Sequence, residues 1–161
     1  MSEAALRGVT AYIGLGANLG DARASVLLAI DAIAALAQTT LRRRSGLYRS
    51  APVDAVGPDF INAVVEVSTT LTAPALLDEL HTLERAAGRT RPYHHAPRSL
   101  DLDLLLYGDA FISSGTLMIP HPRMTQRAFV LRPLAQIAPN RVTAADLQAT
   151  AHQAVERVPD Q

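Results

Sequence analysis

The sequence predicts an α+β fold: a ferredoxin-like two-layer sandwich, with helices on one face of a mainly antiparallel sheet and the active site on the other. Three observations support this. Several segments alternate between apolar and polar residues, two segments have helical apolar periodicity, and their order is strand, helix, strand, strand, helix, strand. We expect the 161 residues to form one domain, 1–161, with 1–8 as a flexible lead-in.

The first predicted strand covers 9–16 and ends in a glycine-rich turn. Alternation puts Gly14 and Gly16 on one face, where a ligand or another backbone could approach closely. The glycine spacing does not match the dinucleotide-binding fingerprint, so we interpret these glycines as serving a tight turn and close packing. Asp21 is a candidate N-cap for a helix predicted over 22–38. The apolar stripe of this helix comprises Val26, Ile30, Ile33 and Ala37.

The middle of the chain is expected to hold two strands and a second helix. We predict strands over 40–48 and 60–71, joined by a loop over 49–59 that is long enough to cover a ligand. The second of these strands places Ile61, Ala63, Val65 and Val67 on the core face and Phe60, Asn62, Val64 and Glu66 on the opposite one. Thr72 is expected to begin a helix that Gly88 ends. Its buried stripe comprises Leu76, Leu80, Leu83 and Ala87.

The last third of the chain begins with a strand and a turn at Gly108. A short strand is predicted over 110–112. A short helix is expected to begin at Thr125 and to be interrupted by Pro133. The tail from Ala144 onward is interpreted as a final, weakly amphipathic helix.

Composition narrows the class of protein. The formal net charge is +0, so there is no overall basic footprint for nucleic acid. Every basic residue other than histidine is an arginine, so any phosphate contact is a guanidinium fork rather than a flexible ammonium. Cysteine is absent, which excludes disulfides and thiolate metal sites. No apolar run approaches ~18 residues, so we expect a soluble, cytoplasmic protein without a membrane partner. We also expect a monomer.

The motif with the clearest chemistry is R-S-L-D-L-D-L-L-L-Y, 98–107. Alternation puts Leu100, Leu102, Leu104 and Leu106 on one face and Ser99, Asp101 and Asp103 on the other. Two such carboxylates repel by roughly 3 kcal/mol at an effective dielectric of ~20 and a separation of ~5 Å. A Mg²⁺ ion between them relieves this repulsion and takes its other ligands from substrate phosphates. The alternative is an ordinary half-exposed strand with solvated aspartates.

The segment before this strand is basic. G-R-T-R-P-Y-H-H-A-P-R, 88–98, contains Arg89, Arg91 and Arg98. Cations beside an acidic metal site suit polyphosphate chemistry, because guanidinium forks neutralise the phosphate charge that the metal leaves. Glu84 stands in the last turn of the preceding helix, where an acid is more often a surface residue.

Alternation gathers several residues on the sheet face away from the predicted helices. They are Gly14, Gly16, Phe60, Asn62, Asp101 and Asp103. An aromatic ring and an amide suit a flat heterocycle, because the ring stacks and the amide reads donor and acceptor edges. Alternatively, Phe60 packs under the 49–59 loop and Asn62 satisfies backbone groups there.

Two other functions compete on the residues alone. A two-metal nucleotidyltransferase also holds a Mg²⁺-nucleotide with a D-x-D strand. An RNA-binding ferredoxin-like domain needs several exposed aromatic residues, and only 4% of this chain is aromatic.

The motifs together resemble the 6-hydroxymethyl-7,8-dihydropterin pyrophosphokinases of folate biosynthesis. The matching segments are A-Y-I-G-L-G-A-N-L-G-D, L-Y-R-S-A-P, F-I-N-A-V-V, E-R-A-A-G-R-T-R, P-R-S-L-D-L-D-L-L-L-Y-G and I-P-H-P-R-M-T-Q-R-A-F-V-L-R-P-L. They extend from Ala11 to about Leu134. The resemblance implies transfer of pyrophosphate from ATP to the hydroxymethyl group of the dihydropterin, with release of AMP.

The resemblance also implies roles for individual residues. Asp101 and Asp103 match the ligands of two Mg²⁺ ions. Both aspartates, together with Arg89 and Arg98, match catalytic residues beside the pyrophosphoryl group that is transferred. Nucleotide contacts fall to Glu84, Arg91, Arg98, His121 and Arg127. The pterin contacts are Val53, Phe60, Asn62 and Phe129. The chain departs from the family in 92–95, P-Y-H-H, where well-known members carry a lysine, an arginine and a tryptophan in a longer loop.

Overall fold

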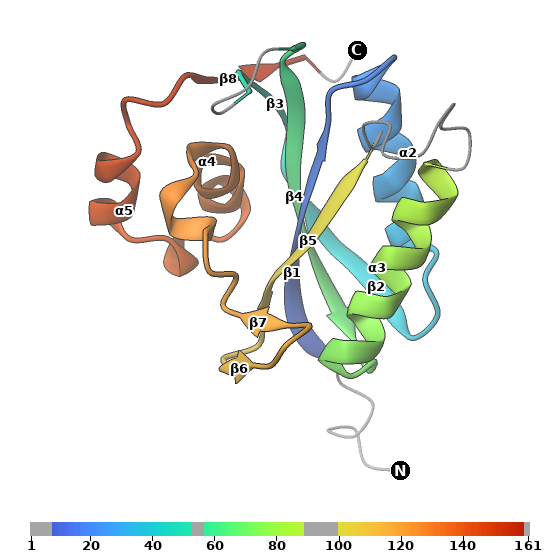
Figure 1. Ribbon diagram of the computed structural model, residues 1–161. Helices are drawn as coiled ribbons and strands as arrows, with labels where there is room; N and C mark the ends of the chain where they lie inside the picture. The colour runs from blue at the N-terminus through green and yellow to red at the C-terminus, as the bar shows by residue number, and fades with distance from the viewer. Residues whose placement is uncertain (1–7, 53–56, 89–99, 160–161) are drawn as a thin grey trace.

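The computed structural model describes residues 8–52, 57–88 and 100–159, and its centre is an antiparallel sheet (Figure 1). The strand order is β5-β1-β4-β3-β8, with β2 also paired to β4. The strands are β1 (Val9–Ala17), β2 (Thr39–Arg44), β3 (Leu47–Ser50), β4 (Phe60–Thr69), β5 (Asp101–Tyr107) and β8 (Val155–Val158). All these pairings are antiparallel. The predicted lead-in lies almost entirely outside the described residues.

Two helices cover one face of the sheet. They are α2 (Ala22–Ala34) and α3 (Ala73–Ala87). Asp21 caps α2 by accepting a hydrogen bond from the backbone N of Ala24 at 3.0 Å, and Thr72 caps α3 through the N of Ala75 at 3.2 Å. The core between this layer and the sheet is completely buried at residues such as Ile13, Ile33, Val65, Leu76 and Leu80.

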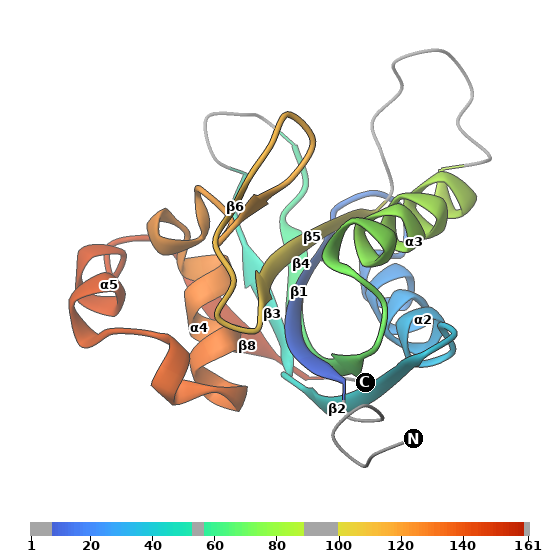
Figure 2. The ribbon, with the colours of Figure 1, turned by 90° about the horizontal axis from the view of Figure 1, so that it is seen from below.

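A third helix packs on the opposite face, so the expectation that helices lie on one face only is incomplete. Figure 2 shows α4 (Ala128–Ile137) across the sheet from α2 and α3. A second core joins α4 to the strands through buried residues that include Val64, Leu105 and Leu134. Val64 and Leu105 are apolar and point away from α2 and α3. Burying their surface against α4 removes it from water.

The strand β5 departs from regular alternation near its end. The register of β1 with β5 shifts between Tyr12 and Ile13, which pair with Leu106 and Leu104. The extra residue, Leu105, is a β-bulge. Leu102 and Leu104 face the α2 and α3 side as predicted, but Leu105 and Leu106 both join the α4 core. The predicted placement of Leu106 was therefore wrong, because a bulge reverses the faces of the residues after it.

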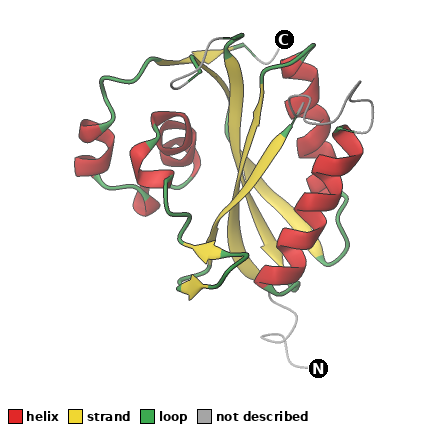
Figure 3. Cartoon of the chain, viewed as in Figure 1, coloured by secondary structure: helices red, strands yellow, loops and turns green. Residues whose placement is uncertain are grey.

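Several boundaries also differ from prediction (Figure 3). The helix predicted over 22–38 ends at Ala34. Gln38 has a positive φ of 60°, which a right-handed α-helix does not contain. The strand predicted over 40–48 is divided into β2 and β3 by Ser45 and Gly46. The short strand predicted over 110–112 is instead β6 (Ile112–Ser113), which pairs with β7 (Met118–Ile119).

The C-terminal part differs most. Pro133 lies inside α4 rather than interrupting it, and its side chain is buried. The predicted final helix is only α5 (Ala144–Ala149), and β8 follows it and joins the sheet beside β3. Two 3₁₀ turns, η1 (Met124–Gln126) and η2 (Pro139–Arg141), flank α4. None of the helices in the described part has the length and apolar character needed to cross a membrane.

The hydroxyl of Tyr12 predicts how stability responds to alkaline pH. It donates a 2.8 Å hydrogen bond to Glu66 Oε1, and burial together with this carboxylate raises the pKa of Tyr12 to about 12. The folded state therefore holds this proton more tightly than the unfolded state, whose tyrosine pKa is near 10. We expect the free energy of unfolding to fall as pH rises from 10 toward 12.

The measurement is urea unfolding at a series of pH values, with tyrosinate absorbance followed in parallel. The chain contains no lysine, so tyrosines dominate proton release in this range. Tyr12→Phe should flatten the dependence. A dependence that is equally steep in this variant would contradict the assignment to Tyr12.

Candidate active site

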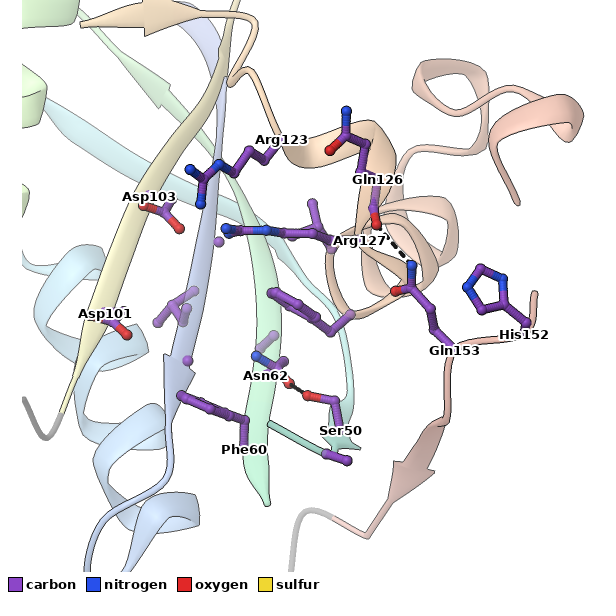
Figure 4. A pocket seen from close by; sticks show the side chains of 17 residues that line it. Ser50, Phe60, Asn62, Asp101, Asp103, Arg123, Gln126, Arg127, His152 and Gln153 are labelled. Atoms are coloured by element: carbon purple, nitrogen blue, oxygen red, sulfur yellow. Dashed lines mark hydrogen bonds between the residues drawn. The ribbon is translucent and has the colours of Figure 1, made fainter. Parts of the chain in front are cut away.

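A pocket of about 840 Å³ opens on the sheet face that carries α4 (Figure 4). One wall is the sheet, and the other is formed by η1, the start of α4 and the segment between α5 and β8. The residues that alternation placed on one face all line it: Gly14, Gly16, Phe60, Asn62, Asp101 and Asp103. The predicted grouping is therefore confirmed, although the grouping alone could not show what forms the opposite wall.

The carboxylates of Asp101 and Asp103 form the acidic side of the pocket. In the register of the sheet they stand opposite Gly16 and Gly14 of β1. The absence of side chains at these glycines leaves the sheet surface beside the carboxylates open. A Cβ at Gly16 would lie 3.0 Å from Asn62 Nδ2, so a larger residue here would crowd the amide.

Two guanidinium groups face the acidic side. Arg123 and Arg127 flank the turn η1, and Figure 4 shows both side chains extended toward Asp103. The guanidinium carbon of Arg127 lies 5.4 Å from the centre of the Phe129 ring, within the range of a cation–π contact. Opposed carboxylates and guanidinium groups suit a ligand that carries both phosphate charge and a metal ion.

His121 lies beside Arg123 and Asp103, outside the set of residues that line the pocket. Its Nδ1 accepts a 3.2 Å hydrogen bond from the backbone N of Arg123, and its Nε2 is 3.9 Å from Asp103 Oδ1. Because Nδ1 is an acceptor, the neutral ring carries its proton on Nε2. Burial lowers the pKa of His121, Asp103 opposes that shift, and Arg127 and Arg123 add to it. His121 Nε2 faces Asp103 at a distance longer than a hydrogen bond.

Phe60 and Asn62 lie at the end of the pocket formed by the first residues of β4 (Figure 4). Asn62 is 4% exposed, and its Oδ1 accepts a 2.6 Å hydrogen bond from Ser50 Oγ. This bond orients the amide so that its Nδ2 is turned toward Gly16 and the pocket. An aromatic ring beside an oriented amide can stack on a flat ring system and read one of its edges.

The remaining predicted site residues lie in the pocket, beside β5 or outside the described residues. Phe129 and Arg127 line the pocket. Glu84 accepts a 2.9 Å hydrogen bond from the backbone N of Leu102 through Oε2, so it holds the start of β5, and its nucleotide contact stays a prediction. Outside the described residues lie Val53, Arg89, Arg91 and Arg98, together with the divergent segment 92–95.

Sequence reasoning missed several pocket residues: Ser50, Arg123, Gln126, His152 and Gln153. Arg123 could have been found, since it stands between the predicted His121 and Arg127. Gln153 and His152 gave no signal, because they reach the pocket only when the chain folds back after α5.

The carboxylate pair fits a magnesium site completed by a substrate. Within the described part of the chain, no three His, Cys, Asp or Glu side chains gather as a metal cluster. Mg²⁺ typically takes one or two carboxylates and fills its other positions with waters and phosphate oxygens. Asp101 and Asp103 supply this donor set, and the half-exposed side chain of Asp103 leaves room for the remaining ligands.

Comparisons with known proteins point to one family. The model of 7,8-dihydro-6-hydroxymethylpterin-pyrophosphokinase (HPPK) matches residues 12–139. The 2-amino-4-hydroxy-6-hydroxymethyldihydropteridine pyrophosphokinase of Haemophilus influenzae is 42% identical over 135 residues, covering 83% of this chain and 84% of that protein. The enzyme of the same name from Synechocystis sp. is 42% identical over 132 residues, which cover 82% of this chain and 68% of that protein.

A solved structure shares the fold. The crystal structure of an HPPK-DHPS triple mutant from Plasmodium falciparum superposes with a TM-score of 0.66 at 14% identity. The superposition covers 86% of this chain and 42% of the length of the Plasmodium falciparum chain.

Proposed function

The chain belongs to the 7,8-dihydro-6-hydroxymethylpterin-pyrophosphokinase family, and from this we propose that it transfers the pyrophosphoryl group of Mg-ATP to 6-hydroxymethyl-7,8-dihydropterin and releases AMP. The hydroxymethyl oxygen attacks the β-phosphorus of ATP and gives up its proton to the carboxylate of Asp103. The bond from the β-phosphorus to the oxygen that bridges it to the α-phosphate breaks, and AMP leaves. The observation that carries the proposal is the opposition, across one pocket, of a carboxylate pair and two guanidinium groups.

The acidic side of the pocket is assigned to the metal and the triphosphate. Asp101 and Asp103 would hold two Mg²⁺ ions, which supply charge neutralisation on the phosphoryl oxygens when bound. Arg127 and Arg123 stabilise the negative charge of the transferring group from the facing wall. His121 is assigned to the phosphates as a hydrogen-bond donor. We retain Arg89, Arg91, Arg98 and Glu84 as proposed nucleotide contacts by resemblance.

The other end of the pocket is assigned to the pterin. Phe60 and Phe129 provide aromatic surface, and Asn62 hydrogen-bonds the ring edge through its oriented amide. Val53 is proposed by resemblance alone. No side chain has to act as a nucleophile, because the substrate hydroxyl attacks phosphorus directly. Catalysis then consists of alignment and charge neutralisation.

The finer description of the fold is also a proposal. We assign β1, α2, β2 with β3, β4, α3 and β5 to a ferredoxin-like core within a single domain, 1–161. The antiparallel strand order and the two helices on one face support this. We further propose a cytoplasmic monomer that acts on small molecules without nucleic acid, and the net charge of +0 supports the last point.

Product identification tests the proposed reaction. The protein is incubated with Mg²⁺, ATP and 6-hydroxymethyl-7,8-dihydropterin, and the nucleotide products are separated. AMP that forms only when the pterin is present is the expected result. ADP would indicate a simple kinase, free pyrophosphate would indicate nucleotidyl transfer, and the absence of turnover would indicate a binding module. Each of these three results contradicts the proposal.

Phe60→Ala should weaken pterin binding. Stacking of a base on an aromatic side chain contributes ~1–3 kcal/mol, so the dissociation constant of the pterin should rise roughly 5- to 150-fold. Fluorescence titration with the pterin measures this directly. The matched control is Phe111→Ala, because the Phe111 side chain is 88% exposed on the surface. Equal affinities in Phe60→Ala and Phe111→Ala would remove Phe60 from the pterin site.

A further inference from the structure

The side-chain amide of Gln153 is hydrogen-bonded on both sides of Arg127. Its Oε1 accepts a 2.8 Å hydrogen bond from the backbone N of Ala128. Its Nε2 donates a 2.8 Å hydrogen bond to the carbonyl of Gln126, which Figure 4 marks. The two partners are the chain neighbours of Arg127. One amide therefore holds the backbone immediately before and after the arginine.

The conformation of Arg127 explains why an external partner is needed there. Arg127 is the N-cap of α4, with an extended backbone at φ −126° and ψ 108°, and it makes no side-chain capping hydrogen bond. Arginine has no acceptor atom, and its side chain is directed into the pocket. The N–H of Ala128, the first helical residue, belongs to the group that a helix cannot satisfy internally. Gln153 accepts from it in place of a capping side chain.

Gln153 is itself held in place by elements distant from the pocket. Its backbone N donates to the carbonyl of Thr150 at 3.0 Å, and Thr150 is buried and bonded through Oγ1 to the carbonyl of Asp146 in α5. On its other side, β8 pairs with β3, where Val155 stands opposite Ser50. The amide is thus anchored to α5 and to the edge of the sheet.

We infer that Gln153 is a positioning residue that fixes Arg127 for contact with the triphosphate. The inference rests on the proposed function of Arg127, and Gln153 lies beyond the residues 12–139 that match the family model. If the amide is lost, the junction between η1 and α4 keeps its side chains but loses the two bonds that set the direction of the guanidinium. Small displacements of a group that aligns a substrate can cost up to ~10²-fold in rate.

The test compares two glutamines that each use their amide in two hydrogen bonds. Gln153→Met keeps the length of the side chain and removes both bonds. The control is Gln136→Met at the other end of α4, where Oε1 accepts from the N of Gly46 at 3.0 Å and from Tyr48 Oη at 2.8 Å. Both variants lose hydrogen bonds that hold α4, so their thermal stability should fall comparably.

We expect kcat/KM for ATP to fall roughly 10- to 100-fold in Gln153→Met, with pterin affinity unchanged. Gln136→Met should stay within about twofold of the parent enzyme. In an Arg127→Ala background, Gln153→Met should cost less than about threefold, since the arginine that it positions is gone. A full loss in that background, or an equal loss in Gln136→Met, would overturn the inference.

A different result would show that the proposed reaction, rather than the positioning role of Gln153, is wrong. If the parent protein forms no AMP from ATP and the pterin, the reaction is wrong. The parent protein, Gln153→Met, Arg127→Ala and the double variant are then compared by calorimetric binding of a non-hydrolysable Mg-ATP analogue. Losses of affinity in Gln153→Met and Arg127→Ala that do not add in the double variant support the positioning role, and additive losses overturn it.

Discussion

Asp103→Asn is expected to lower kcat roughly 10³-fold while leaving the fold intact. Asparagine keeps the shape of the side chain but removes the charge that would hold a divalent ion beside the triphosphate. Metal-ion stabilisation of phosphoryl charge contributes several kcal/mol, and a loss of ~4 kcal/mol corresponds to ~10³-fold in rate. The same change at Asp101 should have a similar effect, because both carboxylates line the same side of the pocket.

The measurement is steady-state AMP formation over a range of Mg²⁺ concentrations. Asp109→Asn is the matched control: this carboxylate follows β5, is 96% exposed and pairs with Arg141 at 2.9 Å on the surface. Its replacement should leave the rate within about twofold, since exposed ion pairs contribute little. Normal turnover in Asp103→Asn at low Mg²⁺ would show that the metal is held elsewhere.

Arg127→Ala should lower kcat/KM for ATP roughly 10²- to 10³-fold, which is the usual cost of removing one preorganised group that stabilises transition-state charge. The guanidinium of Arg127 faces Asp103 across the pocket and stacks near Phe129. Arg127→Lys should recover only part of this loss. Lysine keeps the charge but cannot form the paired hydrogen bonds of a planar fork.

Initial rates at saturating pterin and varied ATP separate these variants. Arg141→Ala is the control arginine, because Arg141 pairs with Asp109 and donates to the carbonyl of Gly108 at 3.0 Å. It should lose some stability but little activity. Full activity in Arg127→Lys would mean that a point charge is sufficient, and full activity in Arg127→Ala would exclude this arginine from the phosphate site.

Much of the sheet side of the pocket could be predicted from local periodicity. Gly14 with Gly16, Phe60 with Asn62, and Asp101 with Asp103 share a face because side chains two residues apart on a strand point the same way. The strand order then brought the three pairs together in one pocket. The capping roles of Asp21 and Thr72 were equally local and equally predictable.

The opposite wall depended on contacts between segments far apart in the sequence. The helix α4 packs on the second face because Val64, Leu105 and Leu106 present apolar surface there, and Leu106 reaches it through a bulge that alternation cannot reveal. Gln153 reaches the two neighbours of Arg127 where the chain passes from α5 to β8. The sequence by itself determined which side chains share the sheet face, since that follows from backbone geometry. Only the tertiary structure decided which groups face them, because nonlocal packing and hydrogen bonding set that choice.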